Sequence, residues 1–235
     1  MDISSFYFTC APIDESLREQ EKTLLYANSI ETRYGRGVRL FEEGTYPKGV
    51  FILKKGRVKI SQSDANGWEQ IIAIHGAGEL FGYRPLLSGE TYPVSGTTLE
   101  PCTIVFVPKK DFQKVLESSA VLSNVLLKYL SHEFTVWVNT ISIMARTTVR
   151  ERLLLTILIL AKKYSHVADN RLTWPIRIGL SKADLACLIG TSSETLARTL
   201  KVIKQERLIT SRGRSLEISG HEQLASIEKH VSVFI

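Results

Sequence analysis

Short apolar runs separated by glycines fill residues 34–108, and spaced leucines before them predict a short helix within 17–33. Gly56 stands between two of the runs, where a hairpin turn needs a residue that tolerates a positive φ angle. Short runs with closely spaced turn residues are typical of antiparallel β structure: a barrel, a sandwich or a jelly roll. The runs that we expect to be strands are 38–41, 50–53, 58–60, 70–74 and 103–107.

A different pattern, with an apolar residue at every third or fourth position, extends from residue 110 to about 145 without glycine or proline. It predicts one helix of about 35 residues, roughly 50 Å long at 1.5 Å per residue. The apolar stripe could pack only on its own β domain, but the length of the helix favours a coiled-coil-like seam between two copies of the chain. The stripe consists of Leu122, Leu126, Leu130, Phe134, Trp137, Ile141 and Met144.

Residues 149–163 predict a further helix, and 180–208 predict two short helices joined by a tight turn. Ser181 is placed to cap the first of these two helices. Gly190 ends it, because glycine accepts the left-handed conformation that a sharp turn requires. Ser192 or Ser193 caps the second helix, which carries apolar residues on its inner face. The order of helix, glycine turn and helix predicts a helix-turn-helix.

Composition and charge narrow the class of protein. The chain has 235 residues, 44% of them hydrophobic, which is an ordinary globular composition. Three widely spaced cysteines, Cys10, Cys102 and Cys187, fit a reduced cytoplasmic protein, and we expect neither a membrane span nor a signal peptide. Residues 1–145 hold 15 basic and 16 acidic side chains, whereas 146–235 hold 15 and 8. The positive charge therefore coincides with the helix-turn-helix, as expected of a DNA-binding segment.

The outer face of the second short helix offers side chains that can read DNA bases. Arginine can donate two hydrogen bonds to guanine, and glutamate can accept one from cytosine. Glu194 and Arg198 are four residues apart, so they share a face and can support each other. After this helix, 208–218 predict a two-stranded wing with a basic tip suited to phosphate. An ordinary helical hairpin with a surface ion pair is the alternative. The candidate DNA-contacting residues are Lys182, Ser192, Ser193, Glu194, Thr195, Arg198, Lys201, Arg212 and Arg214.

Several motifs resemble the CRP/FNR family of bacterial transcription regulators, over about 35–225. The resemblance implies an α+β fold with an N-terminal antiparallel β-roll (a double-stranded jelly roll) in 1–110, a dimerisation helix in 111–146 and a C-terminal winged helix-turn-helix in 147–235. It also implies a homodimeric regulator, not an enzyme, that binds inverted TGA-like half-sites through Glu194 and Arg198 and meets RNA polymerase. The motifs that carry it are 49–60, 78–82, 86–89, 150–153, 180–190 and 194–198.

The sensor departs from the family members that bind cyclic nucleotide. Those members follow Phe-Gly with a glutamate for the ribose and, about nine residues later, have an arginine for the phosphate. Here Tyr83 and Tyr92 stand in those places, and Pro93 has no N–H to donate. Cyclic AMP binding in the usual mode is therefore disfavoured. Arg84 could hold an anionic ligand or lie on the surface. The candidate effector-pocket residues are Gly82, Tyr83, Arg84, Tyr92 and Trp137, and the effector itself is left open.

Other cofactors and activities find little support in the residues. Three cysteines cannot supply the usual four ligands of an iron–sulfur cluster, and no metal-ligand spacing or catalytic triad occurs. A haem ligand could come from His75 or Cys102, although a lone histidine is more often structural. A cupin-like β-roll enzyme would need several histidines in 34–108, which contain only His75. A DNA-binding regulator whose sensor is a ligand-free scaffold is a further alternative.

Overall fold

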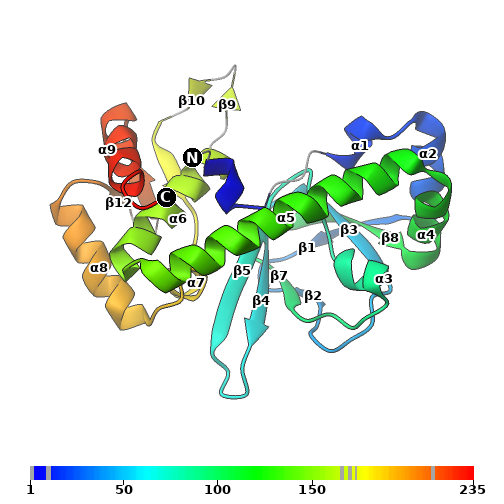
Figure 1. Cartoon of the computed structure of the whole chain (residues 1–235), viewed down its shortest axis with the longest axis horizontal. Helices are drawn as coiled ribbons and strands as arrows, with labels where there is room; N and C mark the ends of the chain where they lie inside the picture. Colours follow the sequence, from blue (N-terminus) through cyan, green and yellow to red (C-terminus); the bar gives the residue numbers. More distant parts are fainter. Residues whose placement is uncertain (1–2, 9–11, 165–166, 169–170, 173, 213–214) are drawn as a thin grey trace. The chain divides into compact units, whose positions relative to one another are not determined.

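The computed structural model describes residues 3–8, 12–164, 167–168, 171–172, 174–212 and 215–235 (Figure 1). The chain divides into two compact units. The first unit is Phe8–Phe134, and the second is Met1–Tyr7 together with Thr135–Ile235. The division falls inside the long helix α5 (Ala120–Arg146), so each unit contains part of this helix.

Two antiparallel four-stranded sheets build the first unit, as the glycine-punctuated runs predict (Figure 1). One sheet has the order β1 (Ile30–Tyr34), β8 (Cys102–Pro108), β3 (Gly49–Lys55) and β6 (Leu80–Phe81). The other has the order β2 (Arg39–Phe41), β7 (Ser95–Thr98), β4 (Val58–Ser63) and β5 (Glu69–His75).

Five expected strands are confirmed, and three others, β1, β6 and β7, were not expected from the sequence. The helix predicted in 17–33 is limited to α2 (Glu19–Leu25), because residues from Ile30 onward pair with β8 instead. The remaining helices of this unit are α1 (Ile13–Ser16), α3 (Arg84–Ser88) and α4 (Lys109–Ser118).

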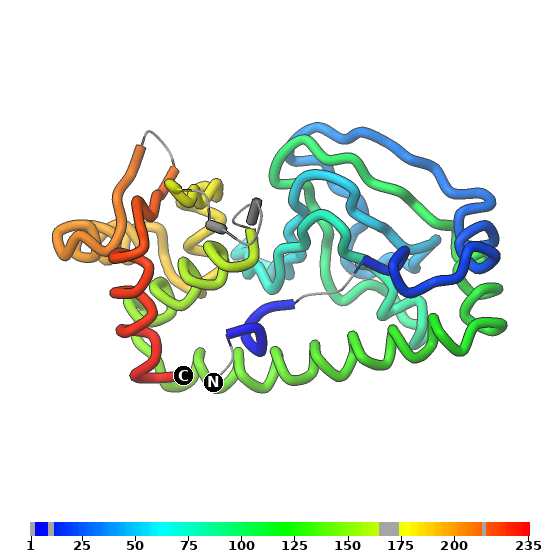
Figure 2. Tube along the Cα trace, turned by 90° about the horizontal axis from the view of Figure 1, so that it is seen from above, coloured from blue at the N-terminus to red at the C-terminus, as the bar shows by residue number. Residues whose placement is uncertain are grey.

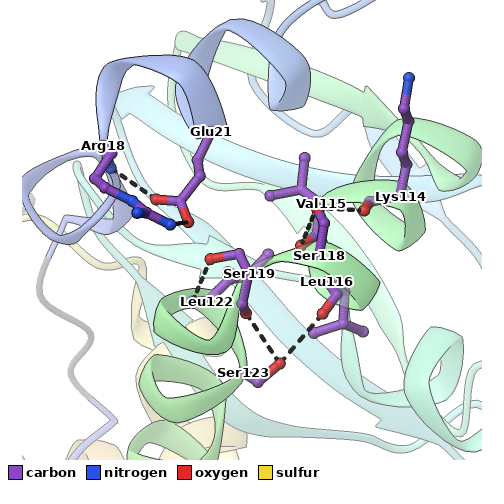
Figure 3. Close-up of polar contacts among 9 residues, drawn as sticks. All are labelled: Arg18, Glu21, Lys114, Val115, Leu116, Ser118, Ser119, Leu122 and Ser123. Carbon is purple, nitrogen blue, oxygen red and sulfur yellow. Dashed lines mark hydrogen bonds and ion pairs between the residues drawn. The ribbon is translucent and has the colours of Figure 1, made fainter.

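The long helix is interrupted, contrary to the prediction of one continuous helix of about 35 residues. Helix α4 ends at Ser118, and α5 begins at Ala120, with Ser119 in an extended conformation at ψ 104°. The Ser119 hydroxyl accepts a 3.0 Å hydrogen bond from the Leu122 backbone N–H, which is the bond of a helix N-cap. Serine side chains compete in this way with helical backbone bonds, which explains the break (Figure 3).

Helix α5 has one face inside the core of the first unit. Leu122 and Leu126 are 0% and 3% exposed and pack with Phe112 and Val105. Tyr129 continues this buried face. The prediction that the whole stripe forms a dimer seam is therefore wrong for Leu122 and Leu126, because the chain's own core already covers them.

The second unit surrounds helix α6 (Val149–Tyr164), which confirms the helix predicted at 149–163. Leucines and isoleucines of α6 are buried together with those of the two helices that follow. Figure 2 shows α5 as one continuous coil that leads toward this helix along the chain. Within the described ranges, no helix is both long and apolar enough to span a lipid bilayer. The other elements are η1 (Ile3–Phe6), β9 (Val167–Ala168), β10 (Arg171–Leu172), β11 (Ile176–Ile178), α7 (Lys182–Ile189), α8 (Ser193–Gln205), β12 (Thr210–Arg212), β13 (Ser215–Ile218) and α9 (His221–Val231).

Candidate nucleic-acid interface

Helices α7 and α8 form the expected helix-turn-helix, and each of its local signals is in place. The Ser181 hydroxyl accepts a 3.0 Å hydrogen bond from the Asp184 N–H and caps α7. Gly190 ends α7 with φ 65° and ψ 55°, the left-handed conformation that a side chain would disfavour. Ser192, not Ser193, caps α8, since its hydroxyl accepts from the Thr195 N–H at 3.1 Å.

Burial of one face of α8 decides which of its side chains reach outward. Leu196, Leu200 and Ile203 are 0–3% exposed and fix the inner face. Because side chains three and four positions apart share a helix face, the opposite face is left to polar groups. Thr195 is half-buried. The candidate residues on the exposed side are Ser192, Ser193, Glu194, Arg198 and Lys201, and Lys182 is exposed on α7.

Glu194 and Arg198 form the expected ion pair on this outer face. The Arg198 Nη2 donates to Glu194 Oε1 at 2.8 Å, and the two side chains are 73% and 78% exposed. An ion pair so open to water contributes little free energy, about 0–1 kcal/mol. Arg198 can therefore exchange this carboxylate for a nucleic-acid acceptor at little cost in free energy. Before such an exchange, the ion pair keeps the guanidinium on the outer face of α8.

The wing follows α8 as predicted, and strand β11 joins its two strands in one sheet. Strands β12 and β13 pair antiparallel, and β11 adds to the far side of β13. Lys204 Nζ donates to Ser211 Oγ at 3.0 Å and thereby joins α8 to the wing. Arg212 is exposed at the end of β12, whereas Arg214 lies outside the described residues.

The effector-pocket candidates of the first unit contact other parts of the same unit. Tyr83 is 1% exposed, and its hydroxyl donates to Glu133 Oε1 on α5 at 2.9 Å. Arg84 Nε lies 3.1 Å from Glu133 Oε2, so it is paired instead of lying freely on the surface. A Cβ added at Gly82, where φ is 78°, would come within 3.4 Å of the Tyr92 hydroxyl. Trp137, the fifth candidate, is half-buried on α5 in the second unit.

Aromatic rings fill the region of the sheets around Gly82. Tyr92 stacks on Phe41 with 4.2 Å between the ring centroids. Phe51 lies 5.6 Å from Phe41 and 5.3 Å from Phe81, again stacked. Burial raises the pKa of Tyr92 to about 12, so this hydroxyl remains neutral at physiological pH. The place where the resemblance implies a phosphate ligand is therefore apolar and uncharged.

The two haem-ligand candidates are both engaged in the protein. His75 is 2% exposed, its Nδ1 lies 2.7 Å from Glu79 Oε2, and its ring stacks on Phe81. The Cys102 thiol donates to the backbone carbonyl of Arg57 at 3.3 Å, and burial raises its pKa, which disfavours the thiolate form that binds metals. Over the described part of the chain, no cluster of three or more His, Cys, Asp or Glu side chains is placed to hold a metal ion.

Two groups of polar contacts were missed from the sequence. Glu133 belongs to the buried face of α5 with Leu126, Tyr129 and Val136, so a carboxylate on an apolar stripe was the available signal. Arg152, on α6, donates to the backbone carbonyls of Thr147 and Ile189. No spacing rule reveals such a contact, since its acceptors are main-chain oxygens outside α6.

Comparison with known protein families identifies both halves of the molecule. The model for the cyclic nucleotide-binding domain matches residues 31–119. The model for the Crp-like helix-turn-helix domain matches residues 151–227. The two matches together cover most of the chain, and the segment between them, 120–150, contains the whole of α5.

Curated relatives are similar over most of their length. The transcriptional activator protein anr of Pseudomonas aeruginosa is 26% identical over 195 residues, which are 82% of this chain and 78% of the relative. The fumarate and nitrate reduction regulatory protein of Escherichia coli is 23% identical over 223 residues, 94% of this chain and 87% of the relative. By their names these relatives are regulators, not enzymes.

Solved structures show the same fold. The c-di-GMP responsive global regulator CLP of Xanthomonas campestris superposes with a TM-score of 0.72 at 21% identity, over 87% of this chain and 100% of CLP. A CooA mutant from Carboxydothermus hydrogenoformans gives 0.72 at 19% identity, over 95% and 96%. With both family segments present in this order and a capped helix-turn-helix in the second, the chain belongs to the CRP/FNR family of DNA-binding transcription regulators.

Proposed function

We propose that the chain regulates transcription as a homodimer that binds double-stranded DNA at two inverted TGA-like half-sites. The carrying observation is the exposed Glu194–Arg198 pair on the outer face of the capped helix α8. The first turns of a recognition helix meet base edges in the major groove, and two such helices in a dimer read half-sites about 34 Å apart. Ser193, Thr195 and Lys201 are the further contact candidates on this helix.

A second copy of the chain is the proposed occupant of the exposed apolar face of α5. Leu127, Phe134 and Ile141 recur every seven residues and are 62%, 70% and 67% exposed. Leu130, Trp137 and Met144 form a second series with the same spacing, three residues further on. Two such series are the a and d positions of a coiled coil. This supports a dimer seam that includes Leu127 and begins after Leu126.

Basic side chains outside α8 are proposed to contact DNA phosphates. Arg212 and Arg214 in the wing and Lys182 at the start of α7 carry the positive charge for this role. Such contacts position a protein on the duplex and carry no base information. RNA polymerase is the expected protein partner and the cytoplasm the expected location, since a regulator of this kind meets both promoter DNA and polymerase there.

Binding of cyclic nucleotide in the usual mode is not part of the proposal. The apolar surroundings of Tyr92 and the engagement of Tyr83 with Glu133 argue against a site for an anionic ribose phosphate. Cyclic AMP and cyclic GMP are therefore expected to leave thermal unfolding unchanged, whereas a ligand at 100 times its Kd would add about 2.7 kcal/mol. A sensor that serves as a ligand-free scaffold is the second candidate, and the same aromatic packing around Phe41 and Phe51 favours it.

The test of the proposed function is a gel shift with a duplex pool. Each duplex carries a TGA half-site and its inverted copy, TCA, about 10 base pairs apart, with randomised flanking bases. Repeated selection with the wild-type chain enriches the duplexes that it binds best. Arg198→Ala should relax the base preference and cost roughly 1–3 kcal/mol of specific binding free energy. An unchanged preference in this variant would show that Arg198 does not read the sequence.

A further inference from the structure

Two arginines in the first turn of α6 contact the end of α7 and the end of α8. Helix α5 ends at Arg146, α6 begins at Val149, and Thr148 lies between them. The Glu151 carboxylate accepts from the Thr148 N–H at 2.7 Å and from its hydroxyl at 2.8 Å. These two hydrogen bonds hold the pKa of Glu151 below its usual value, so the carboxylate stays charged at the start of α6. This capping box fixes where α6 starts.

Arg152 joins this start to the helix-turn-helix. Its Nη1 donates to the carbonyl of Thr147 at 2.7 Å, just past the end of α5. Its Nε donates to the carbonyl of Ile189 at 2.9 Å, the last residue of α7 before the turn at Gly190. The last four carbonyls of a helix lack partners within the helix, so Ile189 offers an acceptor that an outside donor has to satisfy.

Arg150 makes a second contact, at the C-terminal end of α8. Its Nη2 lies 2.7 Å from Glu206 Oε2, and Glu206 is the residue at which α8 ends. One turn of α6 thus contacts the chain before α8 and the residue after it. The Arg150 and Glu206 side chains are both about one-third exposed, so their ion pair contributes little free energy. Arg152 is half-buried, and its hydrogen bonds are therefore the more important of the two contacts.

We infer that Arg152 is a positioning residue for DNA reading: it fixes the turn before α8 against the end of α5. The inference rests on the proposed function of α8. Arginine suits the role, because its planar guanidinium donates in two fixed directions at once, whereas the lysine ammonium is a point charge on a flexible stem. Arg152 touches no base or phosphate in this role and acts only through the backbone of Thr147 and Ile189.

The main test separates positioning from simple loss of folding. Arg152→Met keeps the aliphatic stem and removes both donors. We expect the ratio of non-specific to specific Kd, measured on the enriched TGA duplex and a scrambled duplex of equal length, to fall about tenfold. The non-specific Kd and its salt dependence should stay at the wild-type values. Parallel weakening on both duplexes, or no change on either, would overturn the inference.

Two further variants sharpen the result. Lys162→Met removes one charge and one ion pair, to Glu228, from the same helix and should leave the ratio unchanged. Arg152→Lys keeps the positive charge but lacks the planar guanidinium that donates in two directions. It should therefore show the same reduced ratio of non-specific to specific Kd as Arg152→Met. Full recovery with lysine would mean that charge alone matters. If Arg152→Met does not fold, as judged by circular dichroism, the lysine variant decides by the same measurement.

A readout without DNA keeps this inference apart from the proposed function. In Arg152→Met, amide hydrogen exchange should accelerate in residues 186–196 and stay unchanged in α9. If the wild-type chain shows no preference for the TGA duplex, the proposed half-site is wrong. Hydrogen exchange then still tests whether Arg152 holds the turn before α8. If the preference is present and exchange in 186–196 is unaffected by the substitution, the inference about Arg152 is wrong.

Discussion

The hydroxyl of Tyr83 donates a 2.9 Å hydrogen bond to Oε1 of Glu133, and both side chains are at most 3% exposed. Tyr83 stands where family members that bind cyclic nucleotide carry a glutamate, directly before α3. Glu133 lies 50 residues later on α5. Arg84 adds a positive charge on the other carboxylate oxygen. The segment at the expected effector position is thereby tied to the long helix by a buried polar contact.

Removal of this hydroxyl should destabilise the first unit measurably. Tyr83→Phe leaves Glu133 Oε1 buried without its donor, which costs about 1–3 kcal/mol. Chemical denaturation followed by circular dichroism measures the change. Tyr92→Phe is the matched control, because the Tyr92 hydroxyl lies 3.5 Å from the Gly49 carbonyl, at the limit of a hydrogen bond, and its loss should cost much less. Equal effects of the two substitutions would contradict this assignment.

Acid should weaken the hydrogen bonds by which Glu21 caps the start of α2 at Arg18. The Arg18 side chain, the Ser119 side chain and the Arg18 N–H lower the pKa of Glu21 from 4.5 to about 2. Figure 3 shows the two hydrogen bonds that come from Arg18. A carboxyl whose pKa falls on folding stabilises the fold fully above its unfolded value, and this contribution is lost as the pH falls from 4.5 through about 2.

The pH dependence of unfolding tests this contribution. Glu21→Gln should be less stable than wild type at pH 7, and the difference should shrink steadily as the pH is lowered toward 3. Glu19→Gln controls for the loss of one carboxylate from the same helix, since the Glu19 side chain is 88% exposed. A wild-type advantage over Glu21→Gln that does not depend on pH would show that the charge of Glu21 is not the stabilising feature.

The two faces of α5 should respond to substitution in opposite ways. Ile141→Glu places a charge on an exposed position of the proposed seam and should yield a folded monomer by analytical ultracentrifugation. Leu122→Ala opens a cavity in the core and should cost about 2–5 kcal/mol of unfolding free energy while the dimer persists at low denaturant. A dimer that tolerates glutamate at position 141 would place the interface elsewhere.

Local signals made the helix-turn-helix predictable. Ser181, Gly190 and Ser192 act through their own neighbours in the chain, so each could be identified without knowledge of the fold. The β-rich character of 34–108 followed from turn glycines in the same way. The interaction of Glu194 with Arg198 also depends only on helical spacing.

Contacts between distant segments could not be predicted. The break at Ser119 lies near Glu21 of α2, about a hundred residues earlier in the chain, and the Ser119 side chain helps to lower the pKa of that carboxyl. Residues 122–144 carry two apolar faces, one toward the core and one outward, and an apolar pattern alone merges them into one stripe. The buried partner of Tyr83 depends likewise on how α5 packs against the sheets, which no spacing within the chain encodes.

Arg212 offers a test that distinguishes phosphate contact from base reading. Each phosphate contact that is lost lowers the slope of log Kobs against log salt by about 0.9, so Arg212→Ala should lower it by about two in a dimer. Binding should weaken by a similar factor on specific and scrambled duplexes, because phosphates carry no sequence information. Arg198→Ala should instead change mainly the preference between duplexes. Arg212→Lys keeps the charge and should restore the slope. A change of base preference at constant slope in Arg212→Ala would assign this arginine to the bases instead.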